Sequence, residues 1–272
     1  MTLPPERHFR RTRTLARLLR PAKVFEWLVT AGYFPEPYVL PPCYQVTRHP
    51  GFGKKFFPFK RTQFKPKFSE YLQVQFPKTE LTDRTFGIID PEIHSDIANT
   101  LTKNWKSLLS VLFRQRNKVC SYSFPIPLNR RRPGHIGKLR SGRLIYEFIE
   151  MAEHDVASVA FRYKYLITTD IKNFYPSIYT HSIPWAIHGK KFIRSAKNRH
   201  NYNLFGNRLD KLFQNADDGC TNGVPIGPVV SDLIAEIVLS AVDRMISGEL
   251  EKDILVVRFK DDYRILAKSP AP

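Results

Sequence analysis

The stretch ILVVRFKDDYRILA, residues 254–267, decides the expected fold. Two apolar, β-prone runs, ILVVRF and YRILA, flank the polar residues Lys260, Asp261 and Asp262. Two such runs joined by a short polar turn predict a β-hairpin with the acidic pair at its tip. Adjacent carboxylates repel each other unless a cation lies between them and a further carboxylate. The stretch therefore predicts a sheet and, at the turn of its hairpin, a cation site.

Asp170 provides the third carboxylate. It follows a short strand predicted over residues 165–167, and Pro176, a little further on, suits the first turn of a helix. Three carboxylates that converge at a sheet edge suit two Mg²⁺ ions, for which Mn²⁺ can substitute. Two such ions about 3.5–4 Å apart can bind the attacking 3′-hydroxyl and the leaving oxygen of a nucleotidyl transfer. The alternative is a solvated hairpin turn and an unrelated acidic residue at the end of a strand.

A glycine-rich loop precedes a long predicted helix between these two segments. Gly219, Gly223, Pro225 and Gly227 form a tight loop that allows the backbone to approach a ligand closely. The helix that follows is expected to pack on the sheet, because its apolar residues form one stripe: Leu233, Ile234, Ile237, Val238, Ala241, Val242 and Met245.

Helices are also predicted in the first half of the chain. Residues 6–20 form an arginine-rich helix or arm, which either binds RNA or is a solvated face. Residues 92–115 form a helix with an apolar stripe, which comprises Ile97, Leu101, Trp105, Leu108, Leu109 and Leu112.

Three segments in this order resemble motifs A, B and C of the reverse-transcriptase palm: DIKNFY at 170–175, NGVPIGP at 222–228 and FKDD at 259–262. The chain is most similar to the bacterial defence-associated branch of that family, which includes abortive-infection and retron-like enzymes. The stretches WLVTAGYFPEPYVLPP, residues 27–42, and FYPSIYTHSIPWAIHGK, residues 174–190, also resemble that branch. The resemblance extends roughly from Phe25 to Ala267.

The resemblance implies an α+β fold, the fingers and palm of a right-hand polymerase with an antiparallel palm sheet. Residues 1–70 are then a basic N-terminal arm and an aromatic and basic segment. Residues 71–165 are the fingers with part of the palm, and residues 166–272 are the palm with its three motifs. No thumb follows motif C in this chain. The expected explanations are a fragment, a split or truncated gene product, or a subunit to which a partner protein or a second polymerase subunit supplies a thumb.

The resemblance also implies the roles of the acidic residues. Asp170 and Asp261 are expected to be metal ligands, assisted by the carbonyl of Ile171, and Asp262 is the second member of the catalytic pair. Motif C commonly has Tyr where this chain has Phe259, which is a departure from the family pattern.

Tyr175 lies at the position where a ring excludes a ribose 2′-hydroxyl, so the resemblance implies a preference for dNTPs. Otherwise Tyr175 is a core aromatic residue beside Phe174. The other residues implied to bind the nucleotide are the neighbour of Tyr175, cations of the fingers and residues of motif B: Phe174, Lys138, Arg140, Arg143, Pro225, Ile226 and Gly227. Ile226 stands where many relatives have Gln.

The formal net charge is +18, from 43 Lys and Arg against 25 Asp and Glu, which favours a nucleic-acid partner. In GKKFFPFKRTQFKPKF, residues 53–68, cations alternate with phenylalanines, which is typical of a single-strand contact. Equally, the phenylalanines enter the core. The residues expected to bind nucleic acid are the segment's cations and the lysine of the hairpin, which otherwise only neutralises Asp261: Lys54, Lys55, Lys60, Arg61 and Lys260.

Several protein classes are excluded by composition. Cys43, Cys120 and Cys220 have no CxxC spacing, so a structural zinc site or a disulfide framework is not expected, and a reducing compartment fits best. No apolar run is long enough for a transmembrane helix, and the arginine-rich N-terminus lacks the apolar core of a secretory signal. The expected location is the bacterial cytoplasm, without a membrane partner.

The expected function is that of an enzyme, an RNA-directed DNA polymerase of an antiviral defence system. It adds dNTPs to the 3′-hydroxyl of a nascent DNA, with a template or dedicated non-coding RNA as partner. Three alternatives remain: an RNA-templated RNA polymerase, an untemplated or protein-primed nucleotidyltransferase, and a catalytically silent scaffold that binds RNA.

Overall fold

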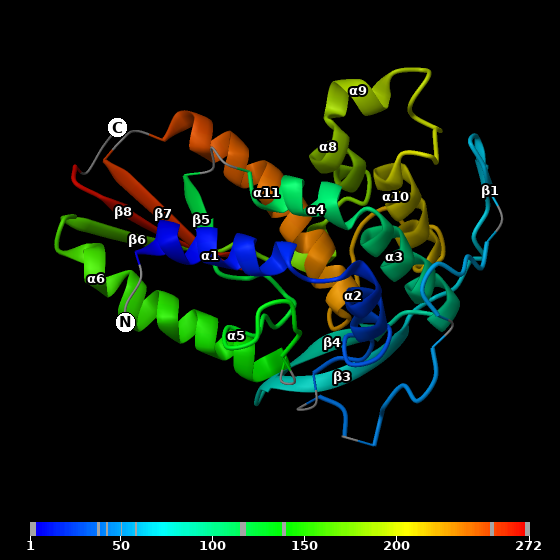
Figure 1. Ribbon diagram of the computed structural model, residues 1–272, viewed down its shortest axis with the longest axis horizontal. Coiled ribbons are helices and arrows are strands. Elements are labelled where there is room, and N and C mark those ends of the chain that lie inside the picture. The colour runs from blue at the N-terminus through cyan, green and yellow to red at the C-terminus, as the bar shows by residue number, and fades with distance from the viewer. Residues whose placement is uncertain are drawn as a thin grey trace. The chain divides into compact units, whose positions relative to one another are not determined.

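The computed structural model describes residues 4–36, 39–41, 43–49, 51–57, 59–114, 118–137, 140–250 and 253–269. The fold is α+β, as expected, with helices and small antiparallel and mixed sheets (Figure 1). In the part of the chain that the structure describes, no helix is long and apolar enough to cross a membrane.

The chain forms two compact units, each of which is built from separated segments. The first, here called the sheet unit, comprises Met1–Leu19, Leu109–Phe174 and Val238–Pro272. The second, here called the helical unit, comprises Arg20–Leu108 and Tyr175–Ile237. The functional regions expected at residues 1–70, 71–165 and 166–272 stay predictions, because contacts within the fold do not test them.

The sheet unit is built on a four-stranded sheet in the order β5-β7-β8-β6. Its strands are β5 (Val119–Ser121), β6 (Tyr165–Thr169), β7 (Ile254–Phe259) and β8 (Asp262–Ala267). Strand β5 runs parallel to β7, whereas the pairs β7–β8 and β6–β8 are antiparallel. The predicted hairpin is therefore confirmed, as is the strand before Asp170, which extends two residues beyond its predicted end.

The core of the sheet unit lies between this sheet and the C-terminal part of α11 (Val229–Glu249). Val119, Val256 and Tyr263 are buried together, and Ile246 of the helix packs against them. The edge strand β6 is much less covered, since Leu166 is 58 % exposed.

Other helices of the sheet unit are α1 (Pro5–Arg17), α5 (Arg140–Ile149), the π-helix η1 (Glu150–Asp155) and α6 (Ala157–Ala160). The predicted basic helix at 6–20 corresponds to α1. Pro5 occupies its first turn, and the buried residues of its inner face are His8, Phe9, Thr12 and Ala16.

The helical unit contains α2 (Pro21–Leu28), α3 (Pro91–Lys103), α8 (Ser182–His188), α9 (Lys190–Arg194) and α10 (Phe205–Asn215). It also contains two antiparallel hairpins, β1 (Phe59–Lys60) with β2 (Gln63–Phe64), and β3 (Leu72–Thr79) with β4 (Thr82–Ile88). The short helix α7 (Phe174–Ser177) and α4 (Trp105–Leu112) are shared between the two units.

The helix predicted over 92–115 is two helices in the structure, α3 and α4. Asp90 begins α3, because its Oδ1 accepts hydrogen bonds from the backbone N–H groups of Glu92 and Ile93 at 3.0 and 3.3 Å. Asn104 ends it, with φ −103° and a side-chain amide that donates to the carbonyl of Thr100 at 2.9 Å. The apolar stripe continues across this break, which is why periodicity alone predicts one helix.

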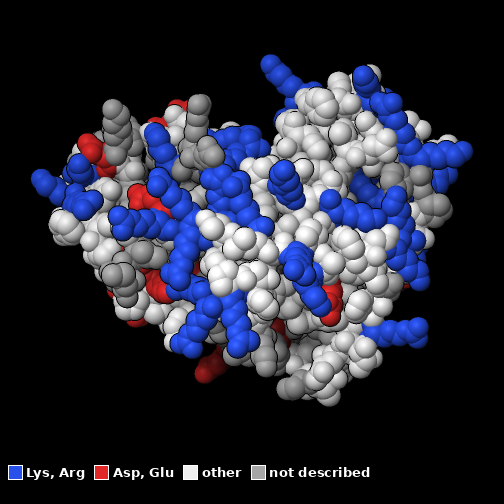
Figure 2. Space-filling model, viewed as in Figure 1, with Lys and Arg blue, Asp and Glu red and all other residues white. Residues whose placement is uncertain are grey.

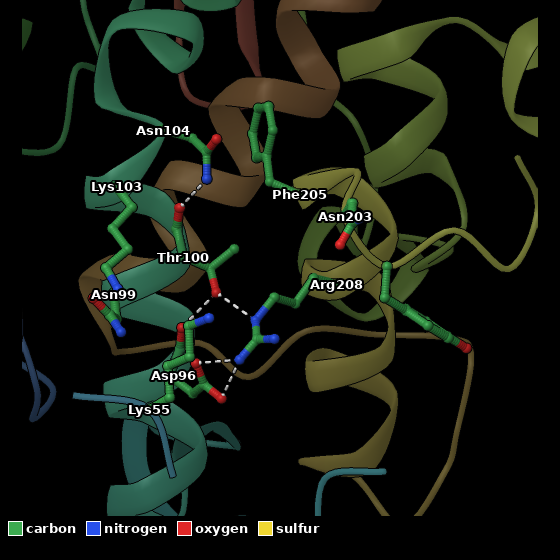
Figure 3. Close-up of a pocket in the computed structure, with 10 residues that line it drawn as sticks. Lys55, Asp96, Asn99, Thr100, Lys103, Asn104, Asn203, Phe205 and Arg208 are labelled. Carbon is green, nitrogen blue, oxygen red and sulfur yellow. Dashed lines mark hydrogen bonds and ion pairs between the residues drawn. The ribbon is translucent and has the colours of Figure 1, made fainter. Parts of the chain in front are cut away.

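A buried ion pair joins α3 to α10. Figure 3 shows Asp96 and Thr100 of α3 pointing toward Arg208 of α10, beside a polar cavity of about 180 Å³. Arg208 Nη2 donates to both carboxylate oxygens of Asp96 at 2.7 Å, and its Nε donates to Thr100 Oγ1 at 3.1 Å. Both charged residues are buried, so each depends on the other for neutralisation.

Candidate active site at the β7–β8 turn

The turn between β7 and β8 has only two central residues, Lys260 and Asp261. Phe259 and Asp262 form the last residue pair of the hairpin. Lys260 has a φ of +52°, which is the pattern of a type II′ turn, where glycine is the usual residue. Asp261 therefore lies at the tip, and Asp262 is the first residue of β8.

Strand β6 brings Asp170 to the same end of the sheet. Thr169 pairs with Tyr263 of β8, so Asp170 and Asp262 are the next residues outward on two adjacent antiparallel strands. The pKa of Asp262 is raised, chiefly by burial and then by the negative charges of Asp261 and Asp170. The structure thus brings together the three carboxylates that sequence reasoning grouped.

A cavity of about 300 Å³ opens beside these carboxylates. Its lining residues come from α5, β6 and β8: Phe148, Thr168, Thr169, Asp170, Asp262, Tyr263 and Arg264. Successive side chains of a strand point to opposite faces, so Arg264 shares a face with Asp262. Its positive charge offsets part of the rise in the pKa of that carboxyl. Sequence reasoning missed Arg264, although its spacing of two residues from Asp262 was a readable signal.

Among the described residues, Asp170, Asp261 and Asp262 are not a group whose ligand atoms all lie within 4.8 Å of one another, so their binding of divalent cations stays a prediction. Within the described residues none of the three makes an ion pair, and each offers oxygen ligands, which Mg²⁺ prefers. Ile171, whose carbonyl was expected to assist, has its side chain packed against the buried Val119, Val256 and Tyr263. Among the described residues, Arg264 is the one cation whose charge shifts the pKa of Asp262.

In the helical unit, the glycine-rich loop expected to be motif B is held by backbone hydrogen bonds. The amide of Val224 donates to the carbonyl of Tyr175 at 3.0 Å, and the amide of Gly87 in β4 donates to the carbonyl of Ile226 at 2.8 Å. Gly227 has a φ of +126°, a backbone conformation that disfavours any side chain. Pro225 follows Val224 in this loop, and its side chain lies over Gly87.

Tyr175 is buried, with 8 % of its surface exposed, and its hydroxyl donates to Asp232 Oδ1 at 2.5 Å. Asp232 lies in the first turn of α11, so the ring is tied to the helix that follows motif B. Phe174, which precedes it, is also buried and is part of the sheet unit.

The expected cations of the fingers are not described. Lys138 lies outside the described residues. Arg140 and Arg143 belong to the backbone of α5, but their side chains lie outside the described part of the structure. Their contact with a nucleotide stays a prediction.

The aromatic and basic segment combines its two expected roles. Phe57 and Phe64 are buried in the helical unit, whereas Phe68 is 61 % exposed. The cations of this segment that were expected to bind nucleic acid are exposed: Lys54, Lys55, Lys60 and Arg61. Figure 2 shows a face on which Lys and Arg side chains far outnumber Asp and Glu.

A second group of residues could hold a metal ion. His8, Glu147 and Glu150 each offer a ligand atom, and these atoms lie within 4.8 Å of one another. Arg130 donates two hydrogen bonds to Glu150 and so neutralises part of this charge, and His8 Nε2 lies 2.7 Å from Glu147 Oε2. Sequence reasoning missed this group because α1 and α5 are far apart along the chain.

All three cysteines are free thiols, and Cys120 is buried, which raises its pKa to about 12. Neither the known protein-family models nor the curated proteins match this chain.

Proposed function

We propose that this chain is the fingers and palm core of a reverse transcriptase in a bacterial antiviral defence system. The observation that supports the proposal is the position of Asp170 and Asp262 at neighbouring ends of two adjacent antiparallel strands, with Asp261 in the turn before Asp262. The order of the three motifs along the chain supports the same conclusion. The substrates are dNTPs and the 3′-hydroxyl of a nascent DNA, and the template is RNA.

The three carboxylates and the carbonyl of Ile171 hold two Mg²⁺ ions in this proposal, and Mn²⁺ can substitute for them. When bound, such ions stabilise the charge that develops on the attacking and leaving oxygens. The chain itself contributes rigid strand ends, which keep Asp170 and Asp262 adjacent, and the positive charge of Arg264, which favours the ionised form of Asp262.

Tyr175 selects the sugar in this proposal. Its hydrogen bond to Asp232 limits the rotation of the ring, which favours a fixed surface that a 2′-hydroxyl cannot pass. Comparing dNTP with rNTP incorporation by the wild type and by Tyr175→Ala tests this role. Equal use of rNTPs and dNTPs by the wild type would instead favour an RNA polymerase or a terminal transferase.

The exposed cations at 54–61 and the lysine of the β7–β8 turn contact the nucleic-acid backbone in this proposal. Free thiols and a strongly basic composition are compatible with work on RNA in the bacterial cytoplasm.

Primer extension on an RNA template, with and without that template, tests the proposed chemistry. Replacing both acids of the turn, Asp261→Asn with Asp262→Asn, is expected to reduce dNTP incorporation by at least about 100-fold, because the metal ligands are lost. Undiminished incorporation would refute the active-site assignment. RNA binding without incorporation by the wild type would favour a scaffold.

The chain offers a matched control in a second pair of adjacent acids. Asp217 and Asp218 also lie in a turn, where Asp218 has a φ of +47°, and burial also raises the pKa of Asp217. They belong to the helical unit and not to the sheet that carries Asp170. The double variant Asp217→Asn with Asp218→Asn loses the same two charges but is expected to retain dNTP incorporation. The comparison shows whether incorporation depends on the proposed metal ligands or only on the net charge of the chain.

A further inference from the structure

The two-residue turn that carries the acidic pair has an unfavourable backbone. Lys260 has a φ of +52°, and a side chain with a Cβ disfavours a positive φ. Glycine is the usual residue at this position of such a turn. The hairpin alone therefore does not account for the conformation that Lys260 adopts.

Both peptide groups of Lys260 are held from outside the turn. The backbone N–H donates to Ser123 Oγ at 2.8 Å, and the carbonyl accepts a hydrogen bond from Arg258 Nη1 at 2.9 Å. Ser123 is 2 % exposed and Arg258 is 1 % exposed, so water does not compete for these bonds. Ser123 comes from the segment after β5, which lies 137 residues before the turn.

Arg258 is itself fixed by α11. Its Nη2 donates to Asp243 Oδ2 at 2.8 Å, and its Nε lies 3.1 Å from both carboxylate oxygens. The hydroxyl of Tyr263, the residue after the acidic pair, donates to Asp243 Oδ1 at 3.1 Å. The helix therefore contacts the strands on both sides of the turn through one buried carboxylate.

A buried ion pair of this kind contributes little net stability compared with apolar residues of the same shape, because both charges lose their hydration. The planar guanidinium of Arg258 nevertheless does something that an apolar residue cannot do. It binds the carboxylate with one edge and the carbonyl of the turn with another, in fixed relative directions.

We propose that Arg258, with Asp243 and Ser123, is a positioning group that holds Lys260 at positive φ and so fixes the backbone of Asp261 and Asp262, on which their proposed binding of divalent cations depends. This role rests on the proposed nucleotidyl-transfer function. Arg258 does not contact the cation or the substrate, and it acts only through the backbone of Lys260.

Mn²⁺ binding to the full chain, measured by electron paramagnetic resonance without nucleic acid, tests the proposal independently of catalysis. Ser123→Ala and Arg258→Lys are expected to weaken the Mn²⁺ binding that depends on Asp261 and Asp262 by about tenfold, the effect of one hydrogen bond. Ser123→Ala removes a single hydroxyl, so it provides the result if Arg258→Lys does not fold. Wild-type affinity in folded Ser123→Ala would overturn the proposal.

Tyr122→Phe is the control for a general loss of stability. It removes the buried side-chain hydrogen bond to Asp155, of 2.9 Å, but keeps the bond from the Tyr122 amide to the Arg258 carbonyl and leaves the Ser123 hydroxyl in place. It is expected to lower the melting temperature and leave Mn²⁺ affinity unchanged. Equal weakening in Tyr122→Phe and Ser123→Ala would mean that the serine only stabilises the unit, which also overturns the proposal.

A double-mutant cycle with Lys260→Gly isolates the backbone effect. Glycine adopts positive φ readily, so Ser123→Ala is expected to weaken Mn²⁺ binding less in the Lys260→Gly background than in the wild type. Additive effects would refute the role through φ. If the wild type shows no Mn²⁺ binding that depends on Asp261 and Asp262, the proposed active site itself fails, a result distinct from unchanged binding in the variants.

Discussion

Replacing His94 by phenylalanine is expected to remove much of the acid sensitivity of the helical unit. His94 lies in α3 with 0 % of its surface exposed, and neither ring nitrogen has a hydrogen-bond partner within the described residues. Its ring packs edge-on against Tyr33, at 4.7 Å between centroids and 90° between planes. Burial lowers the pKa of His94 to about 3, from an ordinary value of 6.5. Phenylalanine keeps the ring contact and has no group to protonate.

The magnitude follows from the difference between the two pKa values. Above pH 6.5 the imidazole is neutral in both states, so it adds no pH dependence to the free energy of unfolding. As the pH falls below 6.5, His94 binds a proton in the unfolded chain but stays neutral in the native fold. This difference stabilises the unfolded state relative to the native state. The loss is about 2 kcal/mol between pH 8 and pH 5 and about 4 kcal/mol at pH 3, and it approaches about 5 kcal/mol only at still lower pH.

Urea unfolding at pH 8 and at pH 5, followed by tryptophan fluorescence, measures this difference. All three tryptophans, Trp27, Trp105 and Trp185, belong to the helical unit and therefore report on it. The wild type is expected to lose about 2 kcal/mol more than His94→Phe between these pH values. The exposed His200 supplies the control, since His200→Phe should keep the wild-type loss. An identical loss in wild type and His94→Phe would refute the reasoning.

Three further substitutions test contacts of the helical unit by the same urea assay at pH 8. Arg208→Met leaves the buried charge of Asp96 uncompensated and is expected to cost about 3–5 kcal/mol, most of which Asp96→Leu in the same chain should restore. Tyr175→Phe removes the hydrogen bond to Asp232 and is expected to cost about 1.5–3 kcal/mol, whereas no loss would mean that this bond adds nothing. Gly87→Ala would place a Cβ 2.5 Å from a side-chain carbon of the motif B loop, so a loss of about 1–3 kcal/mol is expected, and an unchanged midpoint would contradict that packing.

The elements that sequence reasoning predicted well are those with a local signal. The hairpin of β7 and β8 combines two apolar strands with a short polar turn, so its position follows from neighbouring residues alone. The parallel strand β5 has only three residues, Val119–Ser121, and its pairing with β7 is set by a contact more than 130 residues away. No periodic pattern of useful length predicts such a strand.

The residues of the candidate site likewise comprise some that the sequence predicts and some that it does not. Asp170, Asp261 and Asp262 are recognisable because carboxylates at strand ends have a restricted chemistry. The groups behind them, Ser123 and Asp243, are not, because their partners are contributed by distant segments and their residue types are common in loops and helices. Contacts of long sequence separation depend on the complete fold, which a single sequence does not reveal.

One local signal for these hidden contacts was nevertheless present. A two-residue turn between strands calls for glycine or asparagine, and this chain has Lys260 there instead. A residue that contradicts its local conformation persists only where surrounding structure compensates for it, and such positions are concentrated at functional sites. The mismatch at Lys260 therefore indicates support from outside the turn, and the bonds from Ser123 and Arg258 supply that support. By this reasoning, an unfavourable turn residue beside an acidic pair is a reason to look for a buried donor and acceptor directly beneath it.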